Sequence, residues 1–557
     1  MGEGVRLVLL IVMIPYCLSC ELIAKQDTVT NATDHGLGSL RHIITNESSD
    51  GDTIRFSVTL DRDTIILTEE LVIDKDLVIL GNDSTKTFIS GDDATRIIFI
   101  DESSKLVLQN LTLTKGNGIG NSSSGVGGAI YNLGRLDIIN SLLVKNNASL
   151  GGAIYGKADT TNVFYTAIRD NSALAAGGVY IHEGAHLNLS SSFIINNKSE
   201  GRGGGLFMTG SEVSSVIRNT AVIGNSSDKN GGGIFIDFGA VVSIYNSSIE
   251  SNTASDDGGG INNFNGSAFL FDTDVLSNTA NCGGGIYNRK NVNLYRVKVA
   301  ANVSSRIGGG MYNLTNLKMK NSVFSGNEAG LFGGAVANNG PSSVITASNS
   351  TFSGNLSQVG GAIWNNRGHV IAANTIIAKN TDDGQGPDMT SFGESRVTDL
   401  GNNIIGDTTG VFFRFPNSTL KGSKTNPMEP RFMSDVAMAP TLEGDLRLQC
   451  ASPAIDAGLV DTTGLNIGLT DFSGSVRILG QRIDVGAYES SRSRELYVNQ
   501  TSITEMSITF EALDHITSDA ELDQDIIFVA SQTISIITGF KIAKGSMFQA
   551  ILKECID

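Results

Sequence analysis

Three residues have the types and spacing of a zinc site: His182, Glu183 and His186. On a helix, two histidines at this spacing share one face and can bind a metal, with the glutamate as general base. Here the group follows a Gly-Gly-Val-Tyr strand pattern and contains Gly184, which favours a turn. In a strand or turn the two imidazoles do not converge. We therefore predict a solvated turn and no metal site.

A pair of carboxylates, Asp382 and Asp383, follows Asn380. Two such groups held close together can act as general acid and base on a glycosidic bond. However, no Gly-His-Gly or Arg-Ile-Lys run of the kind found in polygalacturonases comes after the pair. We assign no catalytic residue and predict no cofactor. An acidic loop and a weak calcium contact remain alternatives for this pair.

These residues lie in a chain built from repeats. Two glycines followed by a small or aliphatic residue recur, starting at Gly127, Gly151, Gly177, Gly204, Gly232, Gly259, Gly284, Gly309, Gly333 and Gly360. Each copy belongs to a unit marked by an asparagine: Asn146, Asn171, Asn196, Asn225, Asn252, Asn278, Asn302, Asn327, Asn355 and Asn380. These asparagines are 24 to 29 residues apart, and each unit holds about three short β-rich runs. The repeat predicts an all-β fold, a right-handed parallel β-helix, because a propeller blade needs about 40 residues.

Three rows of residues follow from stacking such units. The aliphatic residues after the glycines should point inward, and the asparagines should bond to one another as a ladder. The residue after each aliphatic is usually aromatic, and strand alternation predicts that this row faces outward. Its aromatic members are Tyr131, Tyr155, Tyr180, Phe207, Phe235, Tyr287, Tyr312 and Trp364. The row is either a platform that binds sugar rings or a self-stacked column that only stabilises the rod.

A polysaccharide lyase on such a rod would need a basic residue near calcium-binding carboxylates on adjacent coils. The candidate face carries Lys157, His182, Asp237, Arg289 and Arg367. These residues are scattered rather than clustered, so the sequence gives little support for this chemistry.

Composition and the first residues predict export. Residues 1–19 have the short positive region and apolar run of a signal peptide. Cys20 would then be the first mature residue and a candidate for lipidation. The net charge of −17 argues against nucleic acid as a partner. No later segment is apolar enough to be predicted as a transmembrane helix.

The domain boundaries follow from where the repeat begins and fades. We predict a signal peptide over 1–19, an N-terminal cap over 20–70 and β-helix coils over 71–410. A C-terminal cap region over 411–489 and a small β-rich tail module over 490–557 complete the chain. The mature chain's cysteines are too far apart for a disulfide framework.

Several motifs resemble known families. The Gly-Gly-Ala-Ile marks, with Phe324–Asn327 and Phe352–Asn355, resemble the repeats of chlamydial polymorphic outer-membrane proteins and the wider pectin-lyase-like superfamily. Residues 28–489 resemble bacterial choice-of-anchor Q β-helix proteins, on the motifs Gly38–Arg41, Gly401–Gly406, Ser452–Gly458 and Asp484–Glu489. The tail, with Thr538–Phe540 and Gly545–Ala550, is similar to a 3-coathanger stack domain. The resemblance implies a protein exported to the cell surface, the outer membrane or the medium. It implies no particular reaction.

The leading functional hypothesis is a non-catalytic rod, adhesin-like or carbohydrate-binding, whose partner is a polysaccharide or a host or cell-surface glycan. A polysaccharide lyase or glycoside hydrolase acting on one long face is the alternative. A structural spacer that displays the tail is a third.

Overall fold

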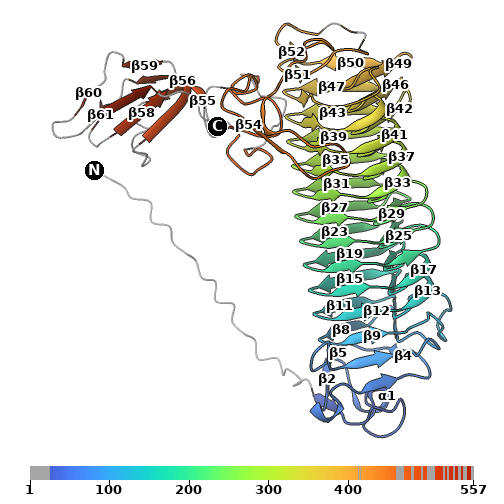
Figure 1. Ribbon diagram of the computed structural model, residues 1–557. Coiled ribbons are helices and arrows are strands. Elements are labelled where there is room, and N and C mark those ends of the chain that lie inside the picture. Colours follow the sequence, from blue (N-terminus) through green and yellow to red (C-terminus); the bar gives the residue numbers. More distant parts are fainter. Residues whose placement is uncertain are drawn as a thin grey trace.

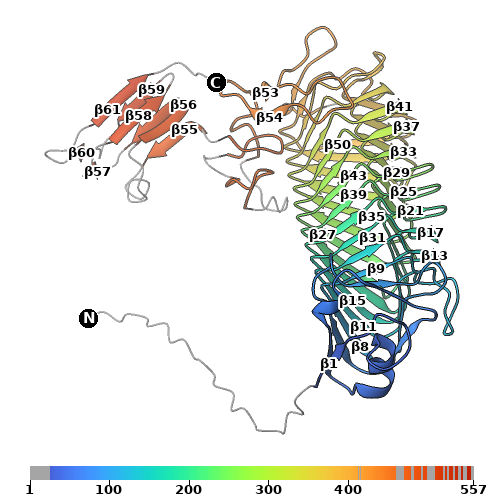
Figure 2. The ribbon, with the colours of Figure 1, turned by 60° about the horizontal axis from the view of Figure 1, so that its bottom comes forward.

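In the computed structural model the chain winds into a long parallel β-helix (Figures 1 and 2). The structure describes residues 25–490 except 412, 414, 460–468 and 478–481, and beyond 490 only the backbone of strands β55 to β61. The predicted signal peptide and Cys20 lie outside these residues. Four parallel sheets run along the rod and are numbered 1 to 4 in the order in which each coil visits them. The prediction of an all-β parallel β-helix is confirmed.

Sheets 1 and 2 have 15 strands each. Sheet 1 consists of β1 (Gln26–Val29), β2 (Asp52–Phe56), β5 (Leu77–Leu80), β8 (Lys105–Gln109), β11 (Arg135–Ile139), β15 (Asp159–Phe164), β19 (Ala185–Ser190), β23 (Ser214–Arg218), β27 (Val241–Tyr245), β31 (Ser267–Phe271), β35 (Asn291–Tyr295), β39 (Asn316–Lys320), β43 (Val344–Ser348), β47 (His369–Ala373) and β50 (Arg396–Asp399). Sheet 2 consists of β3 (Thr64–Ile66), β6 (Phe88–Ser90), β9 (Thr112–Thr114), β12 (Leu142–Val144), β16 (Ala167–Arg169), β20 (Phe193–Ile195), β24 (Ala221–Ile223), β28 (Ser248–Glu250), β32 (Asp274–Leu276), β36 (Lys298–Ala300), β40 (Val323–Ser325), β44 (Thr351–Ser353), β48 (Ile376–Ile377), β51 (Ile404–Ile405) and β52 (Leu420–Lys421).

Sheets 3 and 4 have nine and 13 strands. Sheet 3 consists of β13 (Asn147–Leu150), β17 (Ser172–Ala175), β21 (Lys198–Ser199), β25 (Ser226–Ser227), β29 (Thr253–Ala254), β33 (Thr279–Cys282), β37 (Val303–Ile307), β41 (Glu328–Phe332) and β45 (Leu356–Val359). Sheet 4 consists of β4 (Leu71–Ile73), β7 (Ile98–Ile100), β10 (Ile130–Asn132), β14 (Ile154–Gly156), β18 (Val179–Ile181), β22 (Leu206–Thr209), β26 (Ile234–Asp237), β30 (Ile261–Asn263), β34 (Ile286–Asn288), β38 (Met311–Asn313), β42 (Val336–Asn339), β46 (Ile363–Asn366) and β49 (Met389–Phe392). The middle coils thus have four strands rather than the three expected, because sheet 3 precedes the double glycines.

Elements outside these sheets are few and short. Near the N-terminus they are α1 (Leu40–His42), η1 (Ile43–Glu47) and η2 (Val58–Leu60). An antiparallel pair, β53 (Phe432–Ser434) and β54 (Asp445–Leu448), follows the coils. The tail contains β55 (Ser493–Val498), β56 (Thr509–Ser518), β57 (Glu521–Leu522), β58 (Ile526–Ala530), β59 (Thr533–Ile536), β60 (Lys541–Ile542) and β61 (Phe548–Leu552), all paired in parallel.

A ladder of ten buried asparagines fixes the turn between sheets 2 and 3. Each amide nitrogen in the first nine donates to the amide oxygen of the next coil's asparagine, at 2.8–3.0 Å. Nine of the ten are those predicted. The prediction of Asn196 is wrong by one residue: Asn197 is buried and joins the ladder, whereas Asn196 is exposed and takes a φ of 52° at the bend.

The double glycines are needed because neighbouring coils come close at this corner. Gly283 has a φ of 63°, which side chains rarely adopt. A Cβ on Gly284 would lie 2.4 Å from the carbonyl oxygen of Val303 in the next coil. The inward aliphatic row that follows, including Ile130 and Ile286, is fully buried in one continuous core, as predicted.

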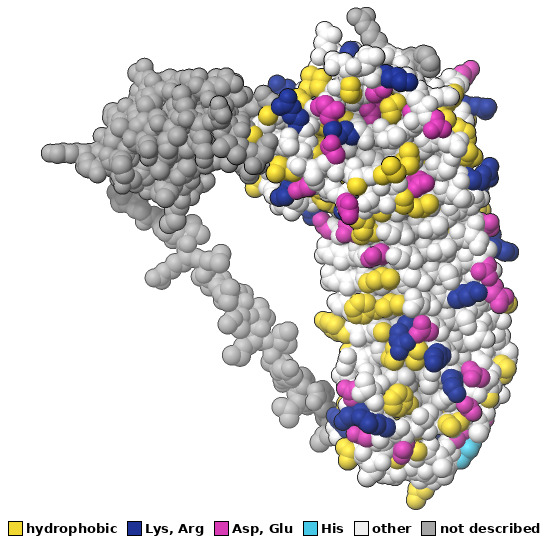
Figure 3. Space-filling view, in the orientation of Figure 1, with side chains coloured by type: hydrophobic (Ala, Val, Ile, Leu, Met, Phe, Trp, Pro, Cys, Tyr) yellow, Lys and Arg dark blue, Asp and Glu magenta, His cyan; other side chains and the backbone are white. Residues whose placement is uncertain are grey.

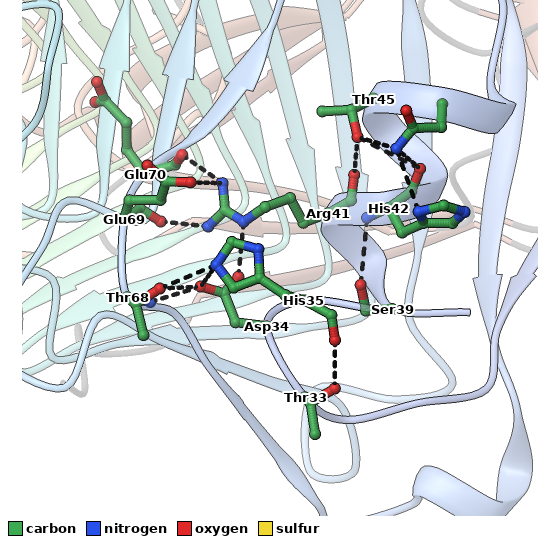
Figure 4. A network of polar contacts seen from close by, with 11 residues as sticks. Thr33, Asp34, His35, Ser39, Arg41, His42, Thr45, Thr68, Glu69 and Glu70 are labelled. Carbon is green, nitrogen blue, oxygen red and sulfur yellow. Dashed lines mark hydrogen bonds and ion pairs between the residues drawn. The ribbon is translucent and has the colours of Figure 1, made fainter. Parts of the chain in front are cut away.

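The N-terminal cap is held by a polar network around Arg41 (Figure 4). Its guanidinium donates to Asp34 at 2.8 Å and to the carbonyl oxygens of Glu69 and Glu70. Ser39 caps α1, and Leu40 is buried in the core. The Gly-Ser-Leu-Arg motif thus ties the first helix to the first coil.

The region after the coils divides into two parts. Phe415 packs against the end of the core, and β52 adds a last strand to sheet 2. From Phe432 onward the chain returns along the outer side of sheet 2. There Ile455 and Val485 pack in one cluster with Ile376. Figure 3 shows this returning segment as a bulge, with hydrophobic side chains gathered on the rod below it.

Candidate functional site: a hollow on sheet 1

The aromatic row predicted to face solvent is mostly buried. Seven of its eight members, Tyr131, Tyr155, Tyr180, Phe207, Phe235, Tyr287 and Trp364, are 0–8% exposed, and Tyr312 is half-buried. Successive rings from Tyr131 to Phe235 lie 4.7–5.5 Å apart between centroids. Leu150 and Ala175 of sheet 3 pack against them. The expected exposure is therefore wrong, because sheet 3 folds against the outer side of sheet 4, and the geometry fits the stacking interpretation.

The His-Glu-Gly-Ala-His group does not form a helix. Its residues occupy the turn after β18 and the start of β19. His182 lies against Tyr155 and Tyr180, with both ring centroids 6.2 Å away, whereas His186 lies 3.3 Å from the carbonyl oxygen of Ser214. Among the described residues, no group of three His, Cys, Asp or Glu side chains is placed to hold a metal ion.

The other candidate charges serve local structure. Asp382 accepts the backbone N–H groups of Gly384 and Gln385 and so closes a turn, while Asp383 is exposed. Asp237 is 5% exposed and accepts the N–H of Phe238. The remaining charges of the predicted lyase face, Lys157, Arg289 and Arg367, stand in separate coils. The Arg289 guanidinium lies over the ring of Phe264, at 4.4 Å.

A different set of side chains surrounds a hollow on the outer face of sheet 1. Its volume is about 440 Å³, and it spans β31, β35 and β39. It is lined by Phe269, Phe271, Asn293, Leu294, Tyr295, Lys318 and Lys320. The strands alternate, so that Ala268, Leu270, Leu294 and Met319 enter the core, while the lining residues other than Leu294 point outward.

Strand register decides the shape of this hollow. Phe269, Asn293 and Lys318 are direct neighbours on three successive strands. Asn293 is short, so it forms a floor between the taller Phe269 and Lys318. In the adjacent row, Phe271 and Tyr295 are tilted by 53° at 6.4 Å between centroids. The result is an aromatic wall, an amide floor and an ammonium wall.

The electrostatics of the hollow come from its two lysines. Lys318 is exposed. Burial and the neighbouring charge of Lys318 lower the pKa of Lys320. Strands β31, β35 and β39 contain no carboxylate. These strands therefore offer groups that bind and orient a ligand, but no pair of carboxylates.

These residues are not among the predicted ones, because the predicted row lies on the strand after each double glycine. The signal was present in the next strand of each unit. Its outward positions read Tyr245, Phe271 and Tyr295 in three successive coils, and Tyr245 and Phe271 are stacked at 4.9 Å.

Comparison with known proteins gives remote similarity only. No family model and no curated protein matches the chain. Among solved structures, an alginate lyase of the PL6 family is 12% identical, with a TM-score of 0.35, over 95% of this chain and 74% of the lyase chain. The Dettilon tailspike protein is 12% identical, with a TM-score of 0.24, over 65% of this chain and 64% of its own. Within the described residues, no helix is both long and apolar enough to span a membrane.

Proposed function

We propose that this chain is an exported carbohydrate-binding rod and that the hollow on sheet 1 holds part of a glycan. The single observation that carries this proposal is the meeting of Phe269, Asn293 and Lys318 on three adjacent strands. Sugar sites combine an aromatic surface for the C–H face of a ring with polar groups for its hydroxyls.

The dimensions of the hollow agree with this role. Phe269 and Lys318 stand two strand separations apart, about 10 Å, which leaves room for one ring between them. The side chain of Asn293 makes no hydrogen bond to any described residue. Its amide can thus offer both donors and acceptors to ligand hydroxyls.

The test is a glycan array probed with the chain lacking residues 1–19. We expect binding that Asn293→Ala and Phe269→Ala each weaken at least tenfold. Thr346→Ala is the matched control, since Thr346 lies on the same face two strands beyond Asn293, outside the hollow. Release of unsaturated uronide or of reducing ends from a bound glycan would show that the chain cleaves its ligand, and an enzymatic role would then replace the proposed binding role. An array without any binding would leave only the spacer role.

Export and surface attachment form a separate part of the proposal. The motif of residues 1–19 supports it. Expression of the full chain in its own cells, followed by fractionation and mass spectrometry of the mature N-terminus, tests it. An intact Met1 on a protein inside the cell would overturn it, and a lipid on Cys20 would identify the anchor.

A further inference from the structure

The part of sheet 1 around the hollow lacks acidic residues. Strands β23, β27, β31, β35, β39, β43 and β47 contain no aspartate or glutamate. The whole chain has 57 acidic and 40 basic residues, so this face departs from the rest of the molecule. Asp272, which directly follows Phe271 of the hollow, is bound by Arg296 at 2.5 and 2.8 Å. Its charge is therefore largely neutralised.

Cations follow one another along this face. Arg218 on β23, Lys318 on β39 and Arg396 on β50 are all exposed, and none forms an ion pair with a described residue. Arg218 and Lys318 are four strands apart, about 19 Å, and Lys318 and Arg396 are three strands apart, about 14 Å. The Arg218 guanidinium lies over the ring of Tyr245, at 4.1 Å, at the end of the aromatic stack next to the hollow. Each cation lies two residues nearer the start of its strand than the one before it in register, so the three charges form a diagonal line across sheet 1 as it climbs the rod.

We propose that the ligand is a polyanionic glycan that runs diagonally up sheet 1, with one sugar in the hollow and its anionic groups near Arg218, Lys318 and Arg396. This inference rests on the proposed function and adds the charge class and direction of the glycan. In a chain of net charge −17, most of the surface repels such a ligand, so the acid-free face also selects where it binds.

Three polymers with the same backbone test the charge class: dextran, carboxymethyl-dextran and dextran sulfate. We expect at least tenfold tighter binding to one or both charged polymers than to dextran. That difference should shrink between 50 and 300 mM salt, because exposed charges are screened. The charged polymer that binds more tightly identifies carboxylate or sulfate as the recognised group. Fragments shorter than the distance from Arg218 to Lys318 should bind more weakly than long ones.

The variant that tests the site is Arg218→Gln with Lys318→Gln. Its matched control is Lys105→Gln with Arg135→Gln, which removes the same charge from the same face of β8 and β11, beside Asp137. We expect at least a tenfold loss for the first pair and less than twofold for the control. Equal losses, no binding of either charged polymer, or equal binding of dextran would overturn the inference. If the array still shows a neutral glycan bound at Asn293, the proposed function survives that result.

Discussion

The amide of Asn380 donates to the carboxylate of Asp388 at 2.8 Å, so the ladder of ten asparagines ends on an acid. An asparagine at this place would continue the ladder but would have only one acceptor oxygen. Both oxygens of Asp388 accept: one from Asn380 and the other from the backbone N–H of Asp407. The acid therefore joins the last coil to the closing turn.

Because the ladder ends on the titratable side chain of Asp388, the stability of the fold should depend on pH. Burial raises the pKa of Asp388 from 3.8 to about 7. Between these values the folded chain keeps a proton that the unfolded chain has lost, so stability falls as pH rises from about 4 to 7. In Asp388→Asn, the slope of unfolding free energy against pH should be shallower there, by up to about 1.4 kcal/mol per pH unit. Denaturant unfolding at several pH values measures it. The exposed Asp383→Asn should keep the wild-type slope, and an unchanged slope in Asp388→Asn would contradict the prediction.

The asparagine ladder should contribute strongly to stability. Asn278→Ala removes the acceptor of the backbone N–H and of one side-chain N–H of Asn252, and it removes the side-chain donor to the carbonyl of Ile249. Each buried group left unpaired costs about 1–3 kcal/mol, so a loss of about 2–5 kcal/mol is expected. Thermal unfolding measures it, with the exposed Asn265→Ala as a control that should stay within about 0.5 kcal/mol. A loss below 1 kcal/mol in Asn278→Ala would show that the ladder is dispensable.

The sequence predicted the ladder because its period is visible in one residue type. It failed at Asn196 because two asparagines stand together, and only the backbone bend decides which one enters the core. It also predicted the wrong exposure for Tyr180. Alternation correctly placed this ring outside the main core, but the sequence did not reveal that sheet 3 would cover it. The hollow was missed for a related reason: the row formed by Phe269, Asn293 and Lys318 exists only after the strands are in register.

One variant of the buried aromatic row can distinguish its two interpretations, a platform that binds sugar rings and a stack that only stabilises the rod. Phe235 is fully buried, and the rings of Phe207 and Phe264 lie 4.8 and 6.2 Å away. Phe235→Ala should lower the free energy of unfolding by about 3–5 kcal/mol while glycan binding at 20 °C stays unchanged. Phe238→Ala removes a ring that is 68% exposed in the same coil and should cost much less. Lost binding in a folded Phe235→Ala would instead support a platform on sheet 4.

A buried ion pair holds the loop over the first coils. Arg96 and Glu70 have fully buried side chains and lie 2.5 Å apart. The same guanidinium donates to the carbonyl oxygens of Val126 and Gly118, on the loop that precedes the first double glycine. Arg96→Met would leave a buried carboxylate uncompensated, a change that costs about 3–5 kcal/mol in such sites.

The loss of stability in Arg96→Met should also be confined to the first coils. Because coils contact mainly their neighbours, amide hydrogen exchange should speed up near β4, β7 and β10 while β42 and β46 stay protected. The control is Arg135→Met, which removes an exposed partner of Asp137 and should cost less than 1 kcal/mol. The double variant Arg96→Met with Glu70→Gln removes both charges, a change that can leave stability unchanged. If it were as stable as wild type, the ion pair would serve to select this conformation of the loop rather than to stabilise the fold. Uniform deprotection along the whole rod would show that the coils unfold as one unit and that the pair anchors them all.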